Sequence, residues 1–462
     1  MSGRRPRVVV VGGGLAGLAA GVEAADRSAA VTLLERRPRL GGATWSFEHR
    51  GISFDNGQHV FMRCCGAYRR FLERIGSASD VRLQSRLEVP VLRPGGPTGA
   101  IRRTAGPAPL HLLASLLTYP HLSRRRRLQA IRTATALRRL DPDDAELDET
   151  TFGDWLAARG TDAVTVEALW DLIVLPTVNV RAAEASLKLA AKVFRTGLLS
   201  RADAADIGWA TVPLSALHGD AARRTLQSAG AEVTTGAAVR GVRRGPGGRP
   251  VVETDGRTIE ADAVVVAVPH DAAGSLLPAG TVAHQERLEE LGTSPIVNVH
   301  LVYDRPVMGL AMAAGAGSDV EFVFDRTDAS GLDDGRQCLT ISLSAARSYI
   351  GRRSPDLVQH FEAEMARLLP AAAGARVTER IVTRERAATF LGAPGTHGLR
   401  PGAPTALPGV YLAGAWCDTG WPATMEGAVR SGVEAARLAT EYAAGRPASP
   451  EPLARRPEAV AA

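Results

Sequence analysis

The sequence predicts an α/β protein in which one parallel-sheet domain is assembled from both ends of the chain. A valine-rich strand, a glycine-rich turn and a helix open the chain, and a second buried strand, turn and long helix close it. Between them lie a block of helical patterns and then a group of strand patterns. We therefore expect an α+β domain inserted into the first domain, in agreement with a length of 462 residues, which exceeds one compact core.

The composition shifts along the chain suggest where the segments of each domain begin and end. The parallel-sheet domain is expected at residues 1–109, 210–270 and 396–444, with a helical cap region at 110–209 and a substrate-domain sheet at 271–395. Residues 445–462 are rich in Pro, Ala and Arg, a composition typical of a disordered tail.

The first forty residues contain a β-α-β pattern. Arg7–Gly12 is expected to form a buried strand, Leu15–Ala25 a helix and Val31–Glu35 a second strand. The turn between the first strand and the helix reads G-x-G-x-x-G, which in this setting is typical of a dinucleotide-binding site. The sequence therefore predicts that an adenine dinucleotide binds here.

Each residue of this motif has a physical role. Gly12 would permit the tight turn, Gly14 would let the backbone approach a pyrophosphate, and Gly17 would let helix and strand pack closely. The N–H groups at the helix N-terminus would bind the phosphates. Glu35, eighteen residues past Gly17 (35 − 17), would accept hydrogen bonds from a ribose diol.

Two further features favour FAD over NAD. Gly41 and Gly42 follow Glu35 closely, where a second backbone segment would meet the pyrophosphate. Near the C-terminus, Gly409–Ala413 is expected to be a buried strand that leads through a Gly/Trp/Pro turn into a helix at Ala423–Tyr442. The N-terminus of that helix would stabilise the negative charge of a reduced flavin.

The middle of the chain is expected to supply the inserted domain. Apolar residues recur at helical spacing from Leu110 to Leu140 and over Phe152–Thr196. The remaining predicted elements are strands at Gly230–Val242, Val251–Thr254, Ala261–Val268, Asn298–Tyr303, Glu321–Phe324 and Cys338–Ser342, and an amphipathic helix at His360–Leu369.

Charge and cysteine content narrow the function classes. The net charge is +6, but the basic residues are scattered and almost all arginine, so no nucleic-acid partner is expected. The four cysteines show no metal or disulfide spacing, which favours a reduced, cytoplasmic compartment. Arg4-Arg5 imitates a secretory signal, but the stretch behind it is the predicted nucleotide-binding strand, so we expect no cleaved signal.

Several motifs together resemble the phytoene desaturase/amine oxidase superfamily of flavoproteins. They are the opening motif, Gly41-Gly42, the strand Ala261–Pro269 and the C-terminal segment Gly409–Gly432. More narrowly, the sequence is similar to the hydroxysqualene dehydroxylases, squalene-associated flavoenzymes of hopanoid biosynthesis. That similarity lies in Asp55–His59, Gly66–Tyr68, Leu175–Asn179 and Trp421–Ala428.

The resemblance implies a glutathione-reductase-like FAD-binding fold and an isoprenoid substrate whose allylic hydroxyl is replaced by hydrogen, giving squalene. By position it assigns the ADP half of FAD to Gly12, Gly14, Gly17, Glu35 and Gly42, the adenine contact to Val239, and the ribityl and ring contacts to Gly414, Thr424 and Met425. The superfamily has Asp after the glycine of the last strand, whereas this chain has Ala415, with Asp418 nearby in the turn.

His59 is the titratable side chain that we expect near the flavin ring, at the end of the extended segment Gly51–His59. Its expected role is to protonate the leaving hydroxyl, and Asp55 would orient it or supply the proton itself. A histidine that serves only packing is the alternative. No metal-ligand constellation occurs in the sequence.

Leu110–Leu117 followed by Arg124–Arg127 allows two interpretations. The segment is either a cap-domain helix with a solvated basic turn, or a peripheral membrane contact in which leucines enter the interface and arginines meet anionic headgroups. The poor aqueous solubility of a long isoprenoid keeps the second interpretation open. The protein would then lie at the inner face of the membrane.

The resemblance leaves other functions open. A carotenoid desaturase would use the flavin in the oxidative direction. An amine oxidase is disfavoured because it usually has a characteristic lysine, and this chain offers only Lys188 and Lys192. A non-enzymatic isoprenoid-binding protein on the same fold would not need intact flavin motifs. The reductive reaction also requires an electron donor, which no motif identifies.

Overall fold

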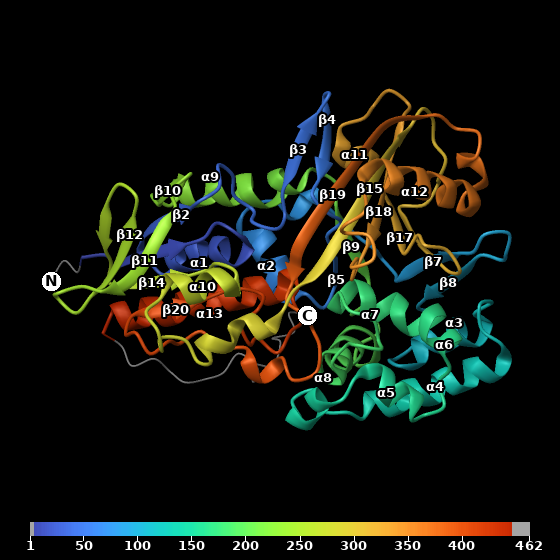
Figure 1. Cartoon of the computed structure of the whole chain (residues 1–462), viewed down its shortest axis with the longest axis horizontal. Coiled ribbons are helices and arrows are strands. Elements are labelled where there is room, and N and C mark those ends of the chain that lie inside the picture. The colour runs from blue at the N-terminus through green and yellow to red at the C-terminus, as the bar shows by residue number, and fades with distance from the viewer. Residues whose placement is uncertain (1–3, 446–462) are drawn as a thin grey trace.

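The computed structural model describes residues 4–445, so the predicted tail lies, apart from Gly445, outside the described residues. One domain contains a five-stranded sheet in the order β10-β2-β1-β14-β20, in which every neighbouring pair is parallel (Figure 1). The strands are β1 (Arg7–Val11), β2 (Ala30–Glu35), β10 (Glu232–Thr235), β14 (Ala263–Val266) and β20 (Val410–Leu412). The strands come from three separate parts of the chain, which confirms the predicted discontinuous α/β domain.

The valine-rich strand β1 is buried on both faces of this sheet. Val8 and Val10 pack in the cluster that contains α1 (Leu15–Asp26) and α13 (Met425–Ala443). Val9 and Val11 pack in the cluster on the opposite face. That face is covered by a three-stranded sheet of β11 (Val239–Arg244), β12 (Pro250–Thr254) and β13 (Thr258–Glu260). Burial on both faces explains why the strand reads as a continuous apolar run.

Helices α1 and α13 pack against each other although they come from opposite ends of the chain. A Cβ at Gly432 of α13 would stand 2.1 Å from the carbonyl oxygen of Ala16 in α1, so only glycine allows this approach. The N-terminal motif and the C-terminal segment are thereby fixed to each other. Two further helices of this domain are α2 (Gly66–Arg74) and α9 (Ala221–Ser228).

The second domain contains a seven-stranded sheet in the order β19-β15-β18-β17-β16-β7-β8, covered by α12 (Ser354–Leu368). Its strands are β7 (Glu88–Leu92), β8 (Gly99–Arg102), β15 (Ser294–Tyr303), β16 (Met312–Gly315), β17 (Phe322–Asp325), β18 (Gln337–Leu343) and β19 (Val377–Thr389). We predicted that residues 1–109 lie in the FAD-binding domain, but β7 pairs with β16 in the second sheet. β7 and β8 join the seven-stranded sheet only through the pairing of β7 with β16, which lies more than 200 positions later in the chain. The division of the chain into domains otherwise stays a proposal.

Helices fill the region between residues 110 and 199, below the second sheet in Figure 1. They are α3 (Leu113–Thr118), α4 (Arg124–Arg138), α5 (Phe152–Ala157), α6 (Ala163–Thr165), α7 (Asp171–Val178) and α8 (Leu187–Phe194). The predicted helical stretch from Leu110 to Leu140 is interrupted at Tyr119–Ser123, where Pro120 removes a backbone donor. Over residues 4–445, no helix is both long and apolar enough to cross a bilayer.

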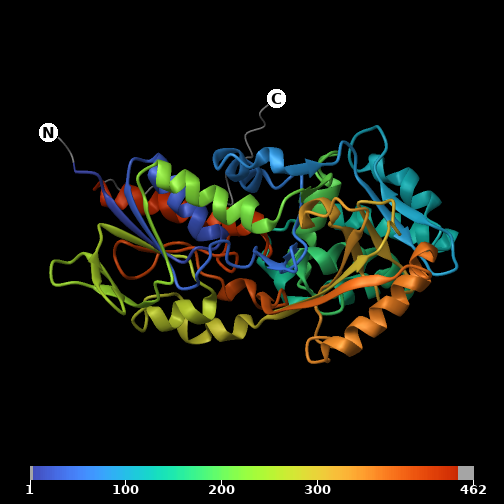
Figure 2. The same ribbon diagram turned by 90° about the horizontal axis from the view of Figure 1, so that it is seen from above.

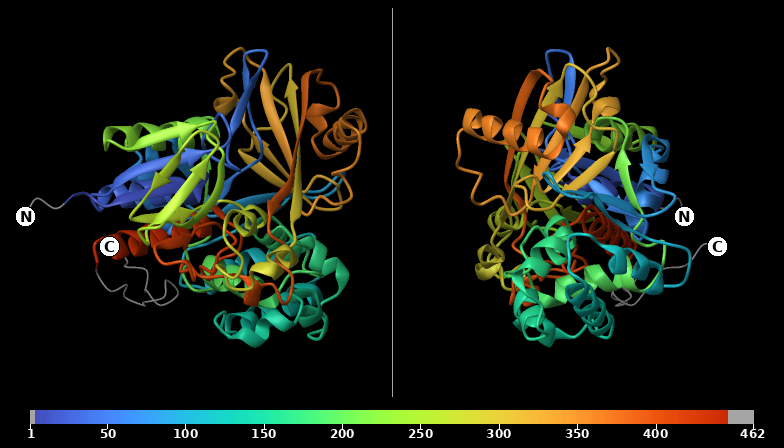
Figure 3. Two further views of the ribbon diagram at one scale, coloured as in Figure 1. Left: turned by 60° about the vertical axis from the view of Figure 1, so that its left-hand side comes forward. Right: turned by 90° about the vertical axis from the view of Figure 1, so that its right-hand side faces the viewer.

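Further strands and helices lie outside the two large sheets. The hairpin of β3 (Ser46–His49) and β4 (Ile52–Asp55) rises beside α11 (Thr327–Ser330) of the second domain. A small sheet contains β5 (Val60–Met62), β6 (Val81–Leu83) and β9 (Ile207–Ala210), and α10 (His270–Leu276) follows β14. Seen from above, the parallel-sheet domain forms one end of an elongated molecule (Figure 2). The second sheet and the helical region lie one above the other at the opposite end (Figure 3).

Candidate active site

The glycine motif lies at the carboxyl edge of the parallel sheet. Gly12 has φ of +109°, and a Cβ there would stand 2.3 Å from the carbonyl oxygen of Ala267. A Cβ at Gly17 would stand only 1.9 Å from the carbonyl oxygen of Gly12. Both positions therefore require glycine. Gly14 caps α1 without a side-chain hydrogen bond, which leaves the N–H groups of the first turn for an anion.

The second glycine pair lies directly beside the first motif. Gly41 pairs with Gly14 in an isolated parallel bridge, and its N–H donates to the carbonyl oxygen of Gly13 at 2.9 Å. Gly42 has φ of +59°, and a Cβ there would stand 2.7 Å from the Cα of Gly14. Two bare backbone segments thus form a cradle that side chains would fill. This cradle fits a pyrophosphate.

Glu35 ends β2 next to the glycine motif. Its buried carboxylate accepts hydrogen bonds from the N–H groups of Gly13 at 2.6 Å and Arg37 at 2.8 Å, which fix its position. The segment that leads to Val239 hydrogen-bonds to the same place, because the N–H of Ala237 donates to the carbonyl oxygen of Glu35 at 2.9 Å. Val239 begins β11 and is half-buried. Its contact with adenine stays a prediction.

The C-terminal turn lies at the same edge of the sheet, since β20 is parallel to β14 and β1. The N–H of Gly414 donates to the hydroxyl of Ser431 at 2.8 Å. Thr424 is the N-cap of α13, with its hydroxyl accepting from the N–H of Gly427, and Met425 is the first residue of the helix. Residues 423–425 are half-buried, and the N-terminus of a nineteen-residue helix points out of this turn.

Arg400 organises this turn and was missed in the sequence. Its buried guanidinium donates to the carbonyl oxygens of Trp416, Cys417 and Trp421 and stacks on Phe390, with Cζ 4.8 Å from the ring centroid. Burial lowers the pKa of Arg400. A single arginine in a loop carries no pattern that would have identified it.

The residue after Gly414 is Ala415, so the carboxylate that the superfamily has at this position is absent, as the sequence indicated. Ala415 offers only its carbonyl oxygen, 3.5 Å from an Arg400 nitrogen. Asp418 is exposed, and its carboxylate accepts from the N–H of Gly420 at 3.1 Å within the turn.

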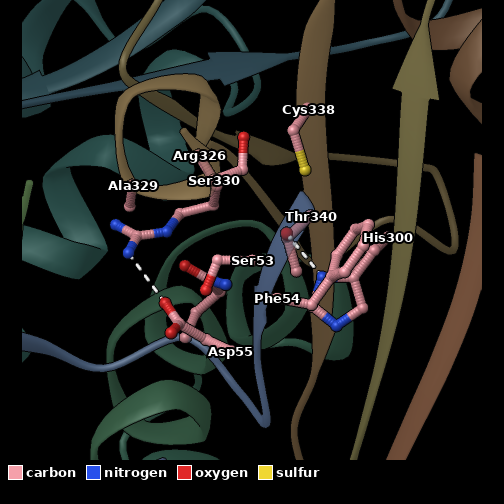
Figure 4. A pocket seen from close by; sticks show the side chains of 10 residues that line it. Ser53, Phe54, Asp55, His300, Arg326, Ala329, Ser330, Cys338 and Thr340 are labelled. Atoms are coloured by element: carbon pink, nitrogen blue, oxygen red, sulfur yellow. Dashed lines mark hydrogen bonds and ion pairs between the residues drawn. The ribbon is translucent and has the colours of Figure 1, made fainter. Parts of the chain in front are cut away.

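Asp55 forms a buried ion pair that the sequence did not reveal. Its carboxylate lies 2.8 Å from the guanidinium of Arg326, which comes from the second domain (Figure 4). It also accepts from the hydroxyl of Ser46 at 2.6 Å and from the N–H of Leu214 at 3.0 Å. Three hydrogen bonds from the protein thus reach the Asp55 carboxylate. Within residues 4–445 no hydrogen bond joins Asp55 to His59, although the negative charge of Asp55 raises the pKa of His59. The role of Asp55 in orienting His59 or supplying the proton stays a prediction.

His59 lies four residues after Asp55, just beyond the end of β4. Its imidazole Nε2 lies 3.7 Å from the position that a Cβ of Gly57 would take. Burial lowers the pKa of His59, while the negative charges of Asp55 and Glu385 oppose this shift. An imidazole with a lowered pKa is uncharged at neutral pH, so a role as acid depends on the nearby carboxylates.

Glu385 of β19 is a further carboxylate at this place. Its Oε1 accepts from the side-chain amide of Asn56 at 2.8 Å and from the indole N–H of Trp45 at 3.3 Å. The amide of Asn56 also donates to the carbonyl oxygen of Ala43, next to Gly42. The second sheet thereby holds the segment from Asn56 to His59 against the glycine cradle. Glu385 lies in a strand that the sequence patterns did not predict.

The motif Gly66–Tyr68 has a structural partner in the C-terminal motif. The buried carboxylate of Glu426 accepts from the N–H groups of Ala67 and Tyr68 at the start of α2 and pairs with Arg430. The hydroxyl of Tyr68 lies 2.8 Å from Nε2 of His218, whose pKa burial lowers to about 3. These contacts tie α2 to α13.

Two cavities adjoin the site. One is bounded by Asp55, Gln58, His300 and Arg326 and has a volume of only about 10 Å³, too small for an organic substrate (Figure 4). The other measures about 400 Å³ and lies between α8 and the turn at Thr419–Trp421. Its lining includes Lys192, Arg195, Arg201 and Arg430, together with Asp141 and Asp143.

Comparisons with known proteins identify the family and the fold of this chain. Residues 15–440 match the family described as flavin-containing amine oxidoreductase. A hydroxysqualene dehydroxylase from Rhodopseudomonas palustris is 29% identical, over 95% of this chain and 99% of that protein. A zeta-carotene desaturase from Zea mays is 25% identical, over 93% of this chain and 82% of that protein. A putrescine oxidase structure superposes with a TM-score of 0.72 at 19% identity, covering 94% of this chain and 98% of that one, which shows the fold.

Proposed function

Because the chain belongs to the family of flavin-containing amine oxidoreductases, we propose that it is a hydroxysqualene dehydroxylase. It is an enzyme, an FAD-dependent oxidoreductase. The reaction replaces the allylic hydroxyl of hydroxysqualene by hydride and releases squalene and water. The observation that carries this proposal is the similarity to the dehydroxylase of Rhodopseudomonas palustris along nearly the full length of both proteins.

The residues at the site divide the work of this reaction. FAD, when bound in its reduced form, supplies the hydride. Gly12, Gly14, Gly17 and the pair Gly41-Gly42 leave space for its pyrophosphate, and Glu35 accepts from its ribose.

At the other end of the cofactor, Gly414, Thr424 and Met425 would hold the ring near the N-terminus of α13, whose positive end would favour the reduced, negatively charged state. His59 donates a proton to the leaving hydroxyl, which lowers the cost of breaking the allylic C–O bond.

A carotene desaturase is the second candidate function, favoured by the similarity to the zeta-carotene desaturase of Zea mays. A desaturase starts from oxidised flavin and removes hydride from its substrate. The dehydroxylase starts from reduced flavin and delivers hydride. The direction of electron flow therefore separates the two functions.

Anaerobic spectroscopy of the purified enzyme tests the proposal. Photoreduced enzyme should be reoxidised by hydroxysqualene, with squalene formed in stoichiometric amount. His59→Ala should slow this step by ~10²–10⁴-fold, because general acid catalysis contributes that much. If phytoene or zeta-carotene reduces the oxidised flavin and hydroxysqualene leaves the reduced flavin unchanged, the enzyme is a desaturase.

We also propose that the helical region contacts the inner face of the membrane, where a long isoprenoid would be taken up. Leu110, Leu117 and Leu128 are 60%, 45% and 52% exposed, and Arg124 and Arg125 are exposed beside them. A leucine-rich surface flanked by arginines is typical of peripheral lipid binding.

The other two arginines of this run serve the protein itself. Arg126 pairs with Asp162, and Arg127 donates to the carbonyl oxygens of Leu117 and Leu122. Replacing Arg124 and Arg125 by Gln should therefore weaken binding to anionic liposomes by ~1 kcal/mol per charge without disturbing the fold. Arg352→Gln with Arg353→Gln, an exposed pair at α12, is the matched control. Equal binding by both double variants would reject the membrane contact.

A further inference from the structure

We propose that Glu385 is a positioning residue for His59: it holds the segment that carries the imidazole and supplies the negative charge that favours its protonated form. The proposal deepens the function proposed above, because it names the group that makes His59 an acid. Glu385 reaches the site from β19, the edge strand of the seven-stranded sheet. The second domain thus contributes a residue to this site.

Asp55 also raises the pKa of His59, but its carboxylate is committed to a buried ion pair. Its side chain is 6% exposed and that of Arg326 is 8% exposed, and the two are 2.8 Å apart. A buried pair at this distance acts on its surroundings as a dipole with little net charge. The effects of the two residues on His59 accordingly have opposite signs: Asp55 raises its pKa and Arg326 lowers it.

Among residues 4–445 no ion pair within 4.0 Å joins Glu385 to a cation. Arg39 interacts with Glu385 through space, while its guanidinium stacks on Trp45 at 3.8 Å and donates to the carbonyl oxygen of Gly42. The hydrogen bonds from Asn56 and Trp45 hold the Glu385 carboxylate in place without removing its charge. Glu385 therefore differs from Asp55 in that no direct ion pair engages its carboxylate among the described residues.

The anchoring also fixes the backbone beside His59. Thr383, on the same face of β19 as Glu385, donates its hydroxyl to the carbonyl oxygen of Asn56 at 2.8 Å. The amide of Asn298 in β15 donates to the same carbonyl oxygen at 3.1 Å. Hydrogen bonds thus hold both the side chain and the main chain of Asn56, three residues before His59. These hydrogen bonds fix the backbone of the segment that carries the imidazole of His59.

The charged and titratable groups that face His59 come from four elements. They are Asp55 of β4, Glu385 of β19, Arg326 before α11, and His218 in the helical turn before α9. His218 is uncharged at neutral pH, since burial lowers its pKa to about 3. Asp55 and Arg326 oppose each other. Asp55 and Glu385 supply the negative charges that raise the pKa of His59, and among residues 4–445 only Asp55 of the two forms an ion pair within 4.0 Å.

The test replaces Glu385 by Gln, which keeps an acceptor for Asn56 and Trp45 but removes the charge. The titration midpoint of His59, followed by NMR of imidazole-labelled holoenzyme and assigned with His59→Gln, should fall by about 1 pH unit. The rate of flavin reoxidation by hydroxysqualene should fall about tenfold at neutral pH and recover at lower pH. Glu385→Asp should restore part of both values.

Glu379→Gln is the matched control. Glu379 lies on the same face of β19 and pairs with Arg50 at 3.1 Å and with His49 at 3.9 Å. This substitution should leave the titration midpoint of His59 unchanged. The proposal is overturned if Glu385→Gln leaves the midpoint of His59 unchanged, whether or not activity falls. A shifted midpoint in an enzyme that does not convert hydroxysqualene would retain the Glu385–His59 coupling and reject the dehydroxylase function instead.

Discussion

The two ends of the predicted FAD site are built in different ways. The nucleotide end consists of backbone: Gly12, Gly14 and Gly17 from one turn and Gly41-Gly42 from the next, with Glu35 between them. The ring end consists of side chains from distant parts of the chain. Asp55 meets Arg326 across 271 positions, and Asn56 meets Glu385 across 329. The first end is local in sequence and the second is assembled by the inserted domain.

This difference has a physical origin. Pyrophosphate is the same in every FAD, and backbone N–H groups with bare glycines bind it without help from other domains. The ring end must also place a substrate and a proton donor, which differ between enzymes of one fold. Buried charges there need partners, and the inserted domain supplies them. Substitutions at the two ends should therefore have different effects: lower stability at the ring end and weaker FAD binding at the nucleotide end.

The largest expected effect is at the ring end. Asp55→Asn would leave the guanidinium of Arg326 buried without a counter-ion, which should lower the free energy of unfolding by ~3–5 kcal/mol. Urea unfolding of the FAD-free protein measures it. The control is Arg240→Gln, which breaks the exposed Arg240–Asp255 pair and should leave stability unchanged. Similar small changes in both variants would mean that the interdomain pair does not stabilise the protein.

At the nucleotide end the expected loss is in FAD affinity. Gly17→Ala would push a methyl group into the carbonyl oxygen of Gly12, displacing α1 from the turn at a cost of ~2–3 kcal/mol. FAD binding, followed by flavin fluorescence quenching, should weaken by about 100-fold. Gly51→Ala is a useful comparison, because Gly51 has φ of +75° but nothing within 4 Å of its Cβ position. If Gly17→Ala binds FAD as well as Gly51→Ala does, the close approach of α1 is not needed for the cofactor.

A smaller effect, with the opposite sign, is expected between the two ends. Ala415→Asp restores the superfamily carboxylate at the turn after β20, where it would accept a hydrogen bond from the ribityl chain. One charge-assisted hydrogen bond should tighten FAD by ~1.5–3 kcal/mol. Asp418→Asn should change little, because Asp418 is exposed and bonded within its turn. Weaker FAD binding by Ala415→Asp, measured by the same fluorescence titration, would show that the turn is already complete.

The sequence by itself determined the nucleotide half of the predicted site and the turn that leads into α13. The four valines of β1, the spacing of Gly12, Gly14, Gly17 and Glu35, and the strand-turn-helix that ends in α13 are local patterns, and each forms the element it predicts. Such patterns are readable because hydrophobic period and glycine position act over a few residues. The last helix is expected within two residues of its observed bounds for the same reason.

Only the tertiary structure decided the ring half. The role of Asp55 beside His59 was predicted from their closeness in sequence, but its ion pair with Arg326 of the second domain could not be. β7 and β8 join the second sheet, and Glu385 and Arg400 reach the site from strands and loops without a motif. Buried ion pairs and strand pairing join residues hundreds of positions apart, and their partners are chosen by packing and desolvation, which no local pattern records.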